Sequence, residues 1–257
     1  MAEITPMMKQ YLEIKEQNKD SILFFRLGDF YEMFNEDAQL ASRELDLTLT
    51  TRDRGKAAED QTPMCGIPYH SSDAYIARLI AKGYKVAICE QTEDPALAKG
   101  LVQRDVIRII TPGTVTESSM LDEHRSNYIS AVYLNNGHAG VSFCDVSTGE
   151  FCCAGFDGDA VSHVINELGR FTPREVVLSM GAEENSAITE FVSSKLGAMP
   201  EHGGDKFEYL QAAELVCRQF GFEDVDKAGL GGESAAVCAV GAVSYTHLRA
   251  HETTLHL

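Results

Sequence analysis

Residues 21–34 read SILFFRLGDFYEMF, and this stretch decides how the first half of the chain folds. Residues 21–27 have the composition of a β-strand, with alternate side chains on opposite faces. Gly28 and Asp29 then give a turn signal, so we expect the strand to end there. A run of aromatic residues follows at once, which makes this turn the most informative point in the chain.

The segments around this strand alternate between helical and extended patterns. Thr5 followed by Pro6 is typical of a helix N-terminus, and the stripe of Ile76 and Leu79 is typical of an amphipathic helix. This alternation predicts an α/β domain with a mixed sheet over residues 1–113. We predict helices over about 6–19, 36–45 and 72–83, strands over 21–27, 47–52, 84–90 and 102–110, and a charged loop over 52–62.

The second half of the chain follows a polar stretch at 114–127, which we interpret as a linker. Beyond it, turn signals separate extended segments, and Val161, Val164 and Leu168 follow at helical spacing. Antiparallel strands followed by helix, strand and helices predict an α/β domain over 128–242 that resembles the ribonuclease H architecture. We predict strands over 128–134, 139–146, 150–156 and 174–179, and helices over about 161–168, 184–196, 206–220 and 233–242.

Residues 243–257 (VSYTHLRAHETTLHL) differ in character from the rest of the chain. They hold three of the eight histidines and show no clean period. The string resembles translated sequencing-adapter read-through at the end of a truncated reading frame. We interpret it as a non-native tail without a function, and a metal-binding tail is the alternative.

Composition narrows the classes of protein. With 44% hydrophobic and 24% charged residues, the chain is neither disordered nor fibrous. No stretch approaches the roughly 20 apolar residues that span a bilayer, and the N-terminus lacks the order of a signal peptide. The seven cysteines form no C-x-x-C pair, so we expect reduced thiols in a cytoplasmic protein.

The formal net charge of −17 argues against nucleic-acid binding only until its distribution is considered. Residues 1–111 hold 14 Lys and Arg against 18 Asp and Glu, a net charge of −4. Residues 112–257 hold 8 against 21, a net charge of −13. We therefore expect any contact with a polyanion in the first half, and a partner protein or solvent against the second.

The aromatic run at residues 30–34 has two explanations. Packing in a hydrophobic core is the commoner role of such a cluster. However, residues after a turn tend to lie near the surface, where Phe30 would be free to stack on a base or wedge between base pairs. Glu32 would be repelled by phosphates unless it bonds to a base edge, a role that discriminates between bases.

Four motifs along the chain resemble the N-terminal part of the bacterial MutS family of DNA mismatch sensors. They stand in the family's order and spacing, and the similarity runs from about residue 5 to residue 242. The motifs are GDFYEMF (28–34), TPMCGIPYH (62–70), VAICEQTEDP (86–95) and VIRIITPGT (106–114).

The resemblance implies a function for the aromatic run. The family reads mispairs with a Phe-x-Glu motif, which falls on Phe30 and Glu32. It implies that Phe30 inserts from the minor groove and stacks on the mispaired base, while Glu32 hydrogen-bonds that base. The first domain would then be a mismatch-binding domain, and the second would be the family's connector domain.

The resemblance also implies partners and a location. The full-length family consists of DNA-dependent ATPases that use ATP and Mg²⁺ and act as homodimers, and the connector contacts MutL. Because no G-x-x-x-x-G-K-[ST] loop occurs in this sequence, we expect no catalysis and no cofactor in this chain itself. We expect it to bind mismatched duplex DNA, to have no membrane contact, and to be cytoplasmic and nucleoid-associated.

Several cations are candidates for contacts with the DNA backbone, although solvated surface charge explains each of them equally well. Tyr69 and His70 lie in a turn-associated motif and are expected to pack rather than to bind. The candidate backbone contacts are Arg52, Arg54 and Lys56 in the charged loop, and Arg78 on a helix.

Two other functions remain open at this point. Asp145 and Glu150 flank a hairpin turn, and paired carboxylates on a ribonuclease H-like layer would fit a metal-dependent nuclease. Such chemistry needs further acids from other elements, and none is assigned by the sequence. The second alternative is a pure protein-interaction fragment that binds MutL.

Overall fold

The computed structural model describes residues 4–52, 55, 61–93, 100–117, 120–121 and 126–251, with side chains described as far as residue 248. The chain divides into two compact units, with the division between Thr111 and Pro112. This division lies just before the stretch at 114–127 that was predicted to be a linker. The described part of the chain holds no helix that is long and apolar enough to cross a membrane.

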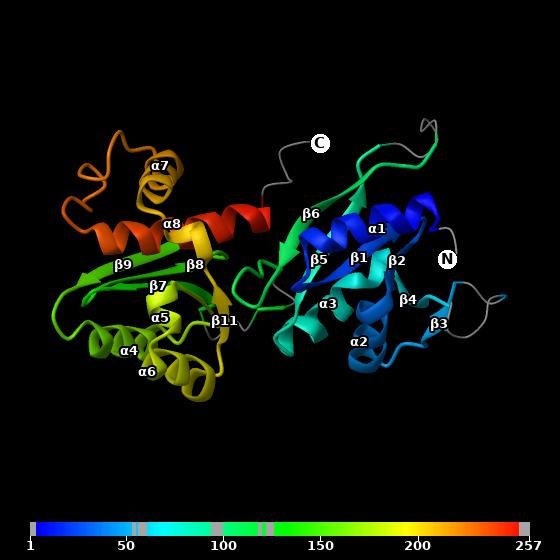
Figure 1. Cartoon of the computed structure of the whole chain (residues 1–257), viewed down its shortest axis with the longest axis horizontal. Coiled ribbons are helices and arrows are strands. Elements are labelled where there is room, and N and C mark those ends of the chain that lie inside the picture. Colours follow the sequence, from blue (N-terminus) through cyan, green and yellow to red (C-terminus); the bar gives the residue numbers. More distant parts are fainter. Residues whose placement is uncertain are drawn as a thin grey trace. The chain divides into compact units, whose positions relative to one another are not determined.

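The first unit is built on a six-stranded mixed sheet with the order β3-β4-β2-β1-β5-β6 (Figure 1). β1 and β5 are parallel, and the other neighbours are antiparallel. The predicted mixed α/β class is therefore confirmed. The strands are β1 (Ser21–Leu27), β2 (Phe30–Phe34), β3 (Thr50–Thr51), β4 (Pro63–Pro68), β5 (Lys85–Gln91) and β6 (Arg104–Ile110).

Helices cover both faces of this sheet (Figure 1). On one face lies α1 (Pro6–Gln17), which begins at the predicted N-cap because the Thr5 hydroxyl accepts a hydrogen bond from Met8 N. Its Tyr11 is buried against β1 and β2. On the other face lie α2 (Asn35–Leu45) and α3 (Ser72–Ala81), and the short 3-10 helix η2 (Tyr69–Ser71) precedes α3.

Two strands of this unit were not predicted. The aromatic run itself forms β2, because the two-residue turn at Gly28 and Asp29 returns the chain antiparallel to β1. The TPMCGIPYH motif supplies β4, which pairs with β2. The predicted strand over 47–52 is corrected to Thr50–Thr51, where only two residues pair with β4.

The second unit has a five-stranded sheet with the order β11-β10-β7-β8-β9. β7, β8 and β9 are antiparallel, whereas β10 and β11 run parallel to β7 on its other side. This arrangement is the predicted ribonuclease H-like layer. The strands are β7 (Tyr128–Asn135), β8 (His138–Asp145), β9 (Glu150–Phe156), β10 (Glu175–Leu178) and β11 (Met199–His202).

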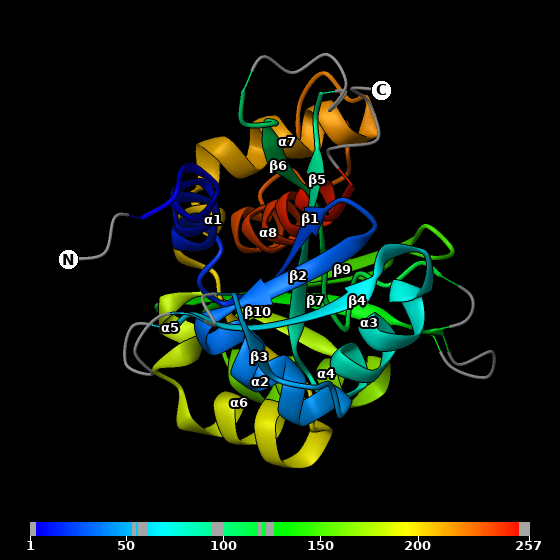
Figure 2. The same cartoon turned by 90° about the vertical axis from the view of Figure 1, so that its right-hand side faces the viewer.

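Helices also cover both faces of the second sheet, as Figures 1 and 2 show. α4 (Ala160–Phe171) buries Val164 and Leu168 on one face, as the helical spacing predicted. α8 (Ser234–His251) packs on the other face against β7 and β8. The remaining helices are α5 (Met180–Glu183), α6 (Ser186–Glu190), the π-helix η4 (Phe191–Leu196), the 3-10 helix η5 (Gly204–Phe207) and α7 (Tyr209–Phe220).

The prediction differs from the structure in two places in this unit. The helix predicted over 184–196 is present as α6, which continues without a gap into the π-helix η4, whereas β11 follows where no strand was predicted. α8 runs through residue 242 without a break, and Val243 and Ser244 are buried. The non-native origin of residues 243–257 stays a prediction.

Candidate nucleic-acid interface

The β1–β2 hairpin carries the residues that the sequence singled out. Gly28 has a φ of +58°, a backbone conformation that side chains with a Cβ rarely adopt, so glycine suits this tight turn. The register pairs Leu27 with Phe30 directly across the turn. Phe30 is therefore the first residue of β2 and lies next to the turn of the hairpin.

Phe30 is exposed although its aromatic neighbours on the same face are buried. Tyr11 of α1 packs edge-on against Phe25 and Phe34, with ring centroids 5.5 and 4.9 Å apart, and both phenylalanines are fully buried. α1 does not extend over Phe30, which keeps 47% of its surface accessible. The core explanation is therefore wrong for Phe30 and correct for Phe34.

Glu32 stands two residues further along β2, on the same face as Phe30. Its side chain is largely buried, with 22% of its surface accessible, and burial raises the pKa of its carboxyl group. Arg52 Nη1 lies 3.9 Å from Glu32 Oε2 and partly opposes this shift of the pKa. A carboxyl group of raised pKa is able to accept a hydrogen bond when ionised and to donate one when protonated.

Gly66 is a residue of this surface that the sequence reasoning did not single out. It lies opposite Glu32 on β4, and its backbone is exposed. A Cβ added at Gly66 would lie 3.3 Å from Tyr31 O and 3.5 Å from Glu32 Cγ. The glycine thus leaves room beside the Glu32 side chain. A glycine inside a strand is itself a signal for the close approach of another group.

The two candidate backbone cations that the structure describes have different partners. Arg52 lies beside Glu32, whereas Arg78 binds the end of α2 through Leu45 O, at 3.1 Å, and Asp46 Oδ2, at 3.0 Å. Arg54 and Lys56 fall outside the described residues. Their DNA contacts stay predictions, and the geometry of Arg78 gives it a structural partner on the protein.

The turn motif at Tyr69 and His70 is only partly packed. The Tyr69 ring is exposed on one side, and the guanidinium of Arg26 lies over its other side, with Cζ 3.5 Å from the ring centroid. The His70 ring meets the Tyr69 ring edge-on at 5.8 Å. Tyr69 N donates a hydrogen bond to Asp29 O (3.0 Å), so this motif is tied to the hairpin turn.

Asp145 and Glu150, the acidic pair of the second unit, both accept hydrogen bonds from neighbouring groups of the protein. Asp145 is buried, and it accepts bonds from Asn127 N at 3.0 Å, from Ser147 N at 2.9 Å and from Ser147 Oγ at 2.6 Å. Burial raises the pKa of Asp145, but these bonds outweigh it and lower the pKa. Glu150 accepts a bond from Tyr128 Oη at 2.6 Å. Nothing in this geometry favours the nuclease alternative. Within the described ranges, no three His, Cys, Asp or Glu side chains form a group that could hold a metal ion.

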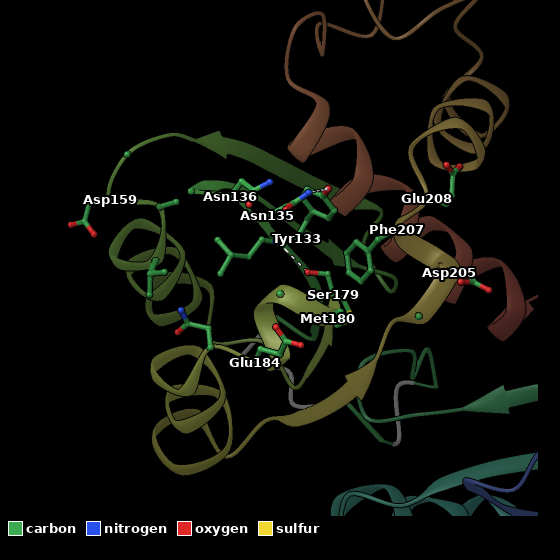
Figure 3. Close-up of a pocket in the computed structure, with 18 residues that line it drawn as sticks. Tyr133, Asn135, Asn136, Asp159, Ser179, Met180, Glu184, Asp205, Phe207 and Glu208 are labelled. Atoms are coloured by element: carbon green, nitrogen blue, oxygen red, sulfur yellow. Dashed lines mark hydrogen bonds between the residues drawn. The ribbon is translucent and has the colours of Figure 1, made fainter.

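The second unit also contains an open pocket of about 750 Å³ at the carboxyl ends of β7 and β10 (Figure 3). Its apolar lining includes Tyr133, Met180 and Phe207. None of its described lining residues is a lysine, arginine or histidine, and its carboxylates would repel phosphate groups. The pocket is therefore a poor site for nucleotides or DNA. Its carboxylates belong to Asp159, Glu184, Asp205 and Glu208.

Comparisons with known proteins cover both units. The family model described as MutS domain I matches residues 5–119, and the one described as MutS domain II matches residues 127–256. Curated relatives called DNA mismatch repair protein MutS are similar to most of the chain. The relative from Acetivibrio thermocellus is 60% identical over 180 residues, which cover 70% of this chain and 20% of the relative.

Two further relatives with the same name match a longer part of the chain. The one from Ruminiclostridium cellulolyticum is 47% identical over 222 residues, covering 86% of this chain and 25% of the relative. The one from Clostridium novyi is 50% identical over 217 residues, covering 84% of this chain and 23% of the relative. The chain thus spans about a fifth to a quarter of the length of these relatives.

Proposed function

Because this chain belongs to the MutS family and carries its domains I and II, we propose that its first unit binds mismatched or unpaired bases in duplex DNA. The observation that carries the proposal is the exposed Phe30 beside Glu32, on the sheet face where α1 covers Phe25 and Phe34. An exposed aromatic ring on a strand that is paired on both sides is a rigid group with one free face. Such a ring is suited to stacking on a base.

Phe30 acts as the wedge in this proposal. A mispaired step is less tightly stacked than a matched one, so it costs less to kink and unstack. Stacking of an aromatic side chain on a base contributes about 1–3 kcal/mol. Because unstacking costs less at a mispair than in matched DNA, this gain outweighs the cost more readily at a mispair. Phe30 thus senses how easily the DNA deforms.

Glu32 supplies the discrimination. Its carboxyl group lies two residues from the wedge on the same face of the sheet, which supports a hydrogen bond to the mispaired base on which Phe30 stacks. Burial raises its pKa, which favours the protonated form that phosphates do not repel. Replacing Glu32 with alanine is expected to weaken discrimination more than total binding, because the hydrogen bond to the base is lost while the repulsion between phosphates and the ionised form of Glu32 is lost with it.

We infer a different role for the second unit. It belongs to the part of the chain with a net charge of −13, and its pocket is lined by carboxylates, so a protein partner suits it better than DNA. By family membership this partner is MutL. ATP, Mg²⁺ and the MutS homodimer are assigned to the parent protein in this proposal, along with a cytoplasmic, nucleoid-associated location. A fragment that only binds MutL is the alternative, and it predicts no DNA affinity.

The experiment compares binding of a G·T duplex and a matched duplex by fluorescence anisotropy. The wild-type chain is expected to prefer the mispair, and Phe30→Ala is expected to abolish the preference. Phe222→Ala is the matched control, because Phe222 is a similarly exposed phenylalanine in the second unit, with 42% of its surface accessible. A preference that survives Phe30→Ala would show that Phe30 is not the wedge.

A further inference from the structure

A set of contacts on the opposite face of the first sheet holds the turn that carries Phe30. Arg26 pairs with Tyr31 across the hairpin, so its side chain points away from the face of Phe30. The Arg26 side chain has only 16% of its surface accessible. Arg26 Nε donates to Gly28 O at 2.6 Å, and Nη1 lies 3.2 Å from Glu90 Oε1 on β5.

The same guanidinium joins two aromatic rings to this turn. It lies over Tyr69 at 3.5 Å from the ring centroid, and the Tyr31 hydroxyl donates to the Glu90 oxygen that Arg26 also binds. Tyr69 N in turn donates to Asp29 O. Both carbonyls of the turn are therefore held, one by the Arg26 side chain and the other by the Tyr69 backbone.

We propose that Arg26 is a positioning residue for mismatch recognition, which fixes the β1–β2 turn and with it the Phe30 wedge before DNA binds. This inference rests on the proposed function. A ring that must enter a base stack loses affinity if its own strand end has to be ordered during binding. Arg26 removes that cost because its planar guanidinium stacks on Tyr69 while it donates hydrogen bonds to Gly28 O and to the Glu90 carboxylate.

The variants that test this role are chosen to remove single interactions of Arg26. Arg26→Lys keeps a cation near Glu90 but loses the stacking plane and the fixed fork of donors. Tyr69→Phe keeps both the ring and the backbone N–H, so it is expected to behave like wild type, whereas Tyr69→Ala loses the ring. Arg43→Lys is the matched control, because Arg43 is an exposed arginine on α2 that pairs with its neighbour Glu44.

The first readout needs no DNA. Hydrogen exchange of the Tyr69 amide, which donates to Asp29 O, is expected to accelerate roughly tenfold in Arg26→Lys and to stay unchanged in Arg43→Lys. The Val86 amide region, in the parallel pairing of β1 and β5 far from the turn, serves as an internal reference. An unchanged exchange rate of the Tyr69 amide in Arg26→Lys would show that Arg26 does not fix the β1–β2 turn.

The second readout is the ratio of affinities for G·T and matched duplexes in the 257-residue chain. Arg26→Lys and Tyr69→Ala are each expected to reduce this ratio about tenfold, and the double variant no further, because both remove one stacked pair. A wild-type preference that Arg26→Lys retains would overturn the positioning role alone. A wild-type chain without any preference would overturn the proposed function, and the positioning role with it.

Discussion

Gly66 offers a test of whether the base approaches Glu32 across the β2–β4 pair. A valine at this position would place its Cβ 3.3 Å from Tyr31 O and 3.5 Å from Glu32 Cγ, so the backbone at Tyr31 would have to shift by a few tenths of an ångström. Its methyl groups would then extend over the Glu32 side chain on the same face of the sheet. Because β-branched residues favour strands by up to about 1 kcal/mol, we expect stability to change by no more than about that amount.

The expected effect on recognition is larger than the effect on stability. Covering Glu32 leaves its partly buried carboxyl group without a hydrogen-bond partner on the base, which costs about 1–3 kcal/mol. This loss corresponds to a reduction of mismatch preference by roughly 5- to 150-fold. Gly66→Ala is the graded control, since it adds the Cβ alone and is expected to lose much less.

Anisotropy titrations of G·T and matched duplexes measure the preference, and thermal unfolding measures stability. The reasoning would be refuted by a Gly66→Val chain that unfolds like wild type and still prefers the mispair. Such a result would mean that the base reaches Glu32 from a direction that Gly66 does not border.

Three further predictions concern groups at or near the site. Burial raises the pKa of Glu32, and phosphates do not repel its protonated form, so mismatch affinity is expected to fall as pH rises through that pKa. Glu32→Gln should keep the mismatch preference but flatten this part of the pH profile. An unchanged slope in Glu32→Gln would contradict the assignment. Asp37→Ala is expected to destabilise the first unit by about 3–5 kcal/mol, because Asp37 is buried, lies 2.9 Å from Lys15 Nζ and accepts a hydrogen bond from Leu23 N at 2.9 Å. Chemical denaturation followed by probes specific to each unit would measure this change. A loss below about 1 kcal/mol would count against a stabilising Asp37–Lys15 ion pair. Burial raises the pKa of Cys65 to about 11 and of Cys89 to about 12, so a thiol reagent at neutral pH is expected to label exposed Cys153 first and these two only on unfolding; mass spectrometry of the labelled peptides decides the order.

Local signals in the sequence predicted most of the regular elements. The strand at 21–27, the N-cap at Thr5 and the amphipathic helix around Val164 all follow from residues within one turn or one strand, and the structure confirms them. The strands β2, β4 and β11 were missed for a physical reason. β4 and β11 are short strands whose partners lie far along the chain, and β2, although it pairs with β1 across a two-residue turn, carries an aromatic run in place of a clear polar alternation.

The residues of the candidate site also separate into those that the sequence predicted and those that depend on contacts with distant parts of the chain. Composition favoured a buried core for the aromatic run, and this holds for Phe34 but not for Phe30. How much of the sheet α1 covers depends on how the helix packs on the strands, which no local signal in the run encodes. The roles of Phe30 and Glu32 came from the family resemblance. Gly66 and Arg26 escaped attention because their partners, Glu32 and Glu90, lie far along the chain and meet them only through the sheet.

The central claim is that Phe30 enters the base stack at a mispair, and 2-aminopurine fluorescence tests it most directly. The probe is placed next to a G·T mispair, where its emission is quenched by stacking on its neighbours. The account predicts that the chain increases the emission of this duplex, that it leaves a matched duplex unchanged, and that Phe30→Ala removes the increase while Phe222→Ala does not. An equal increase with Phe30→Ala, or with matched DNA, would contradict the claim.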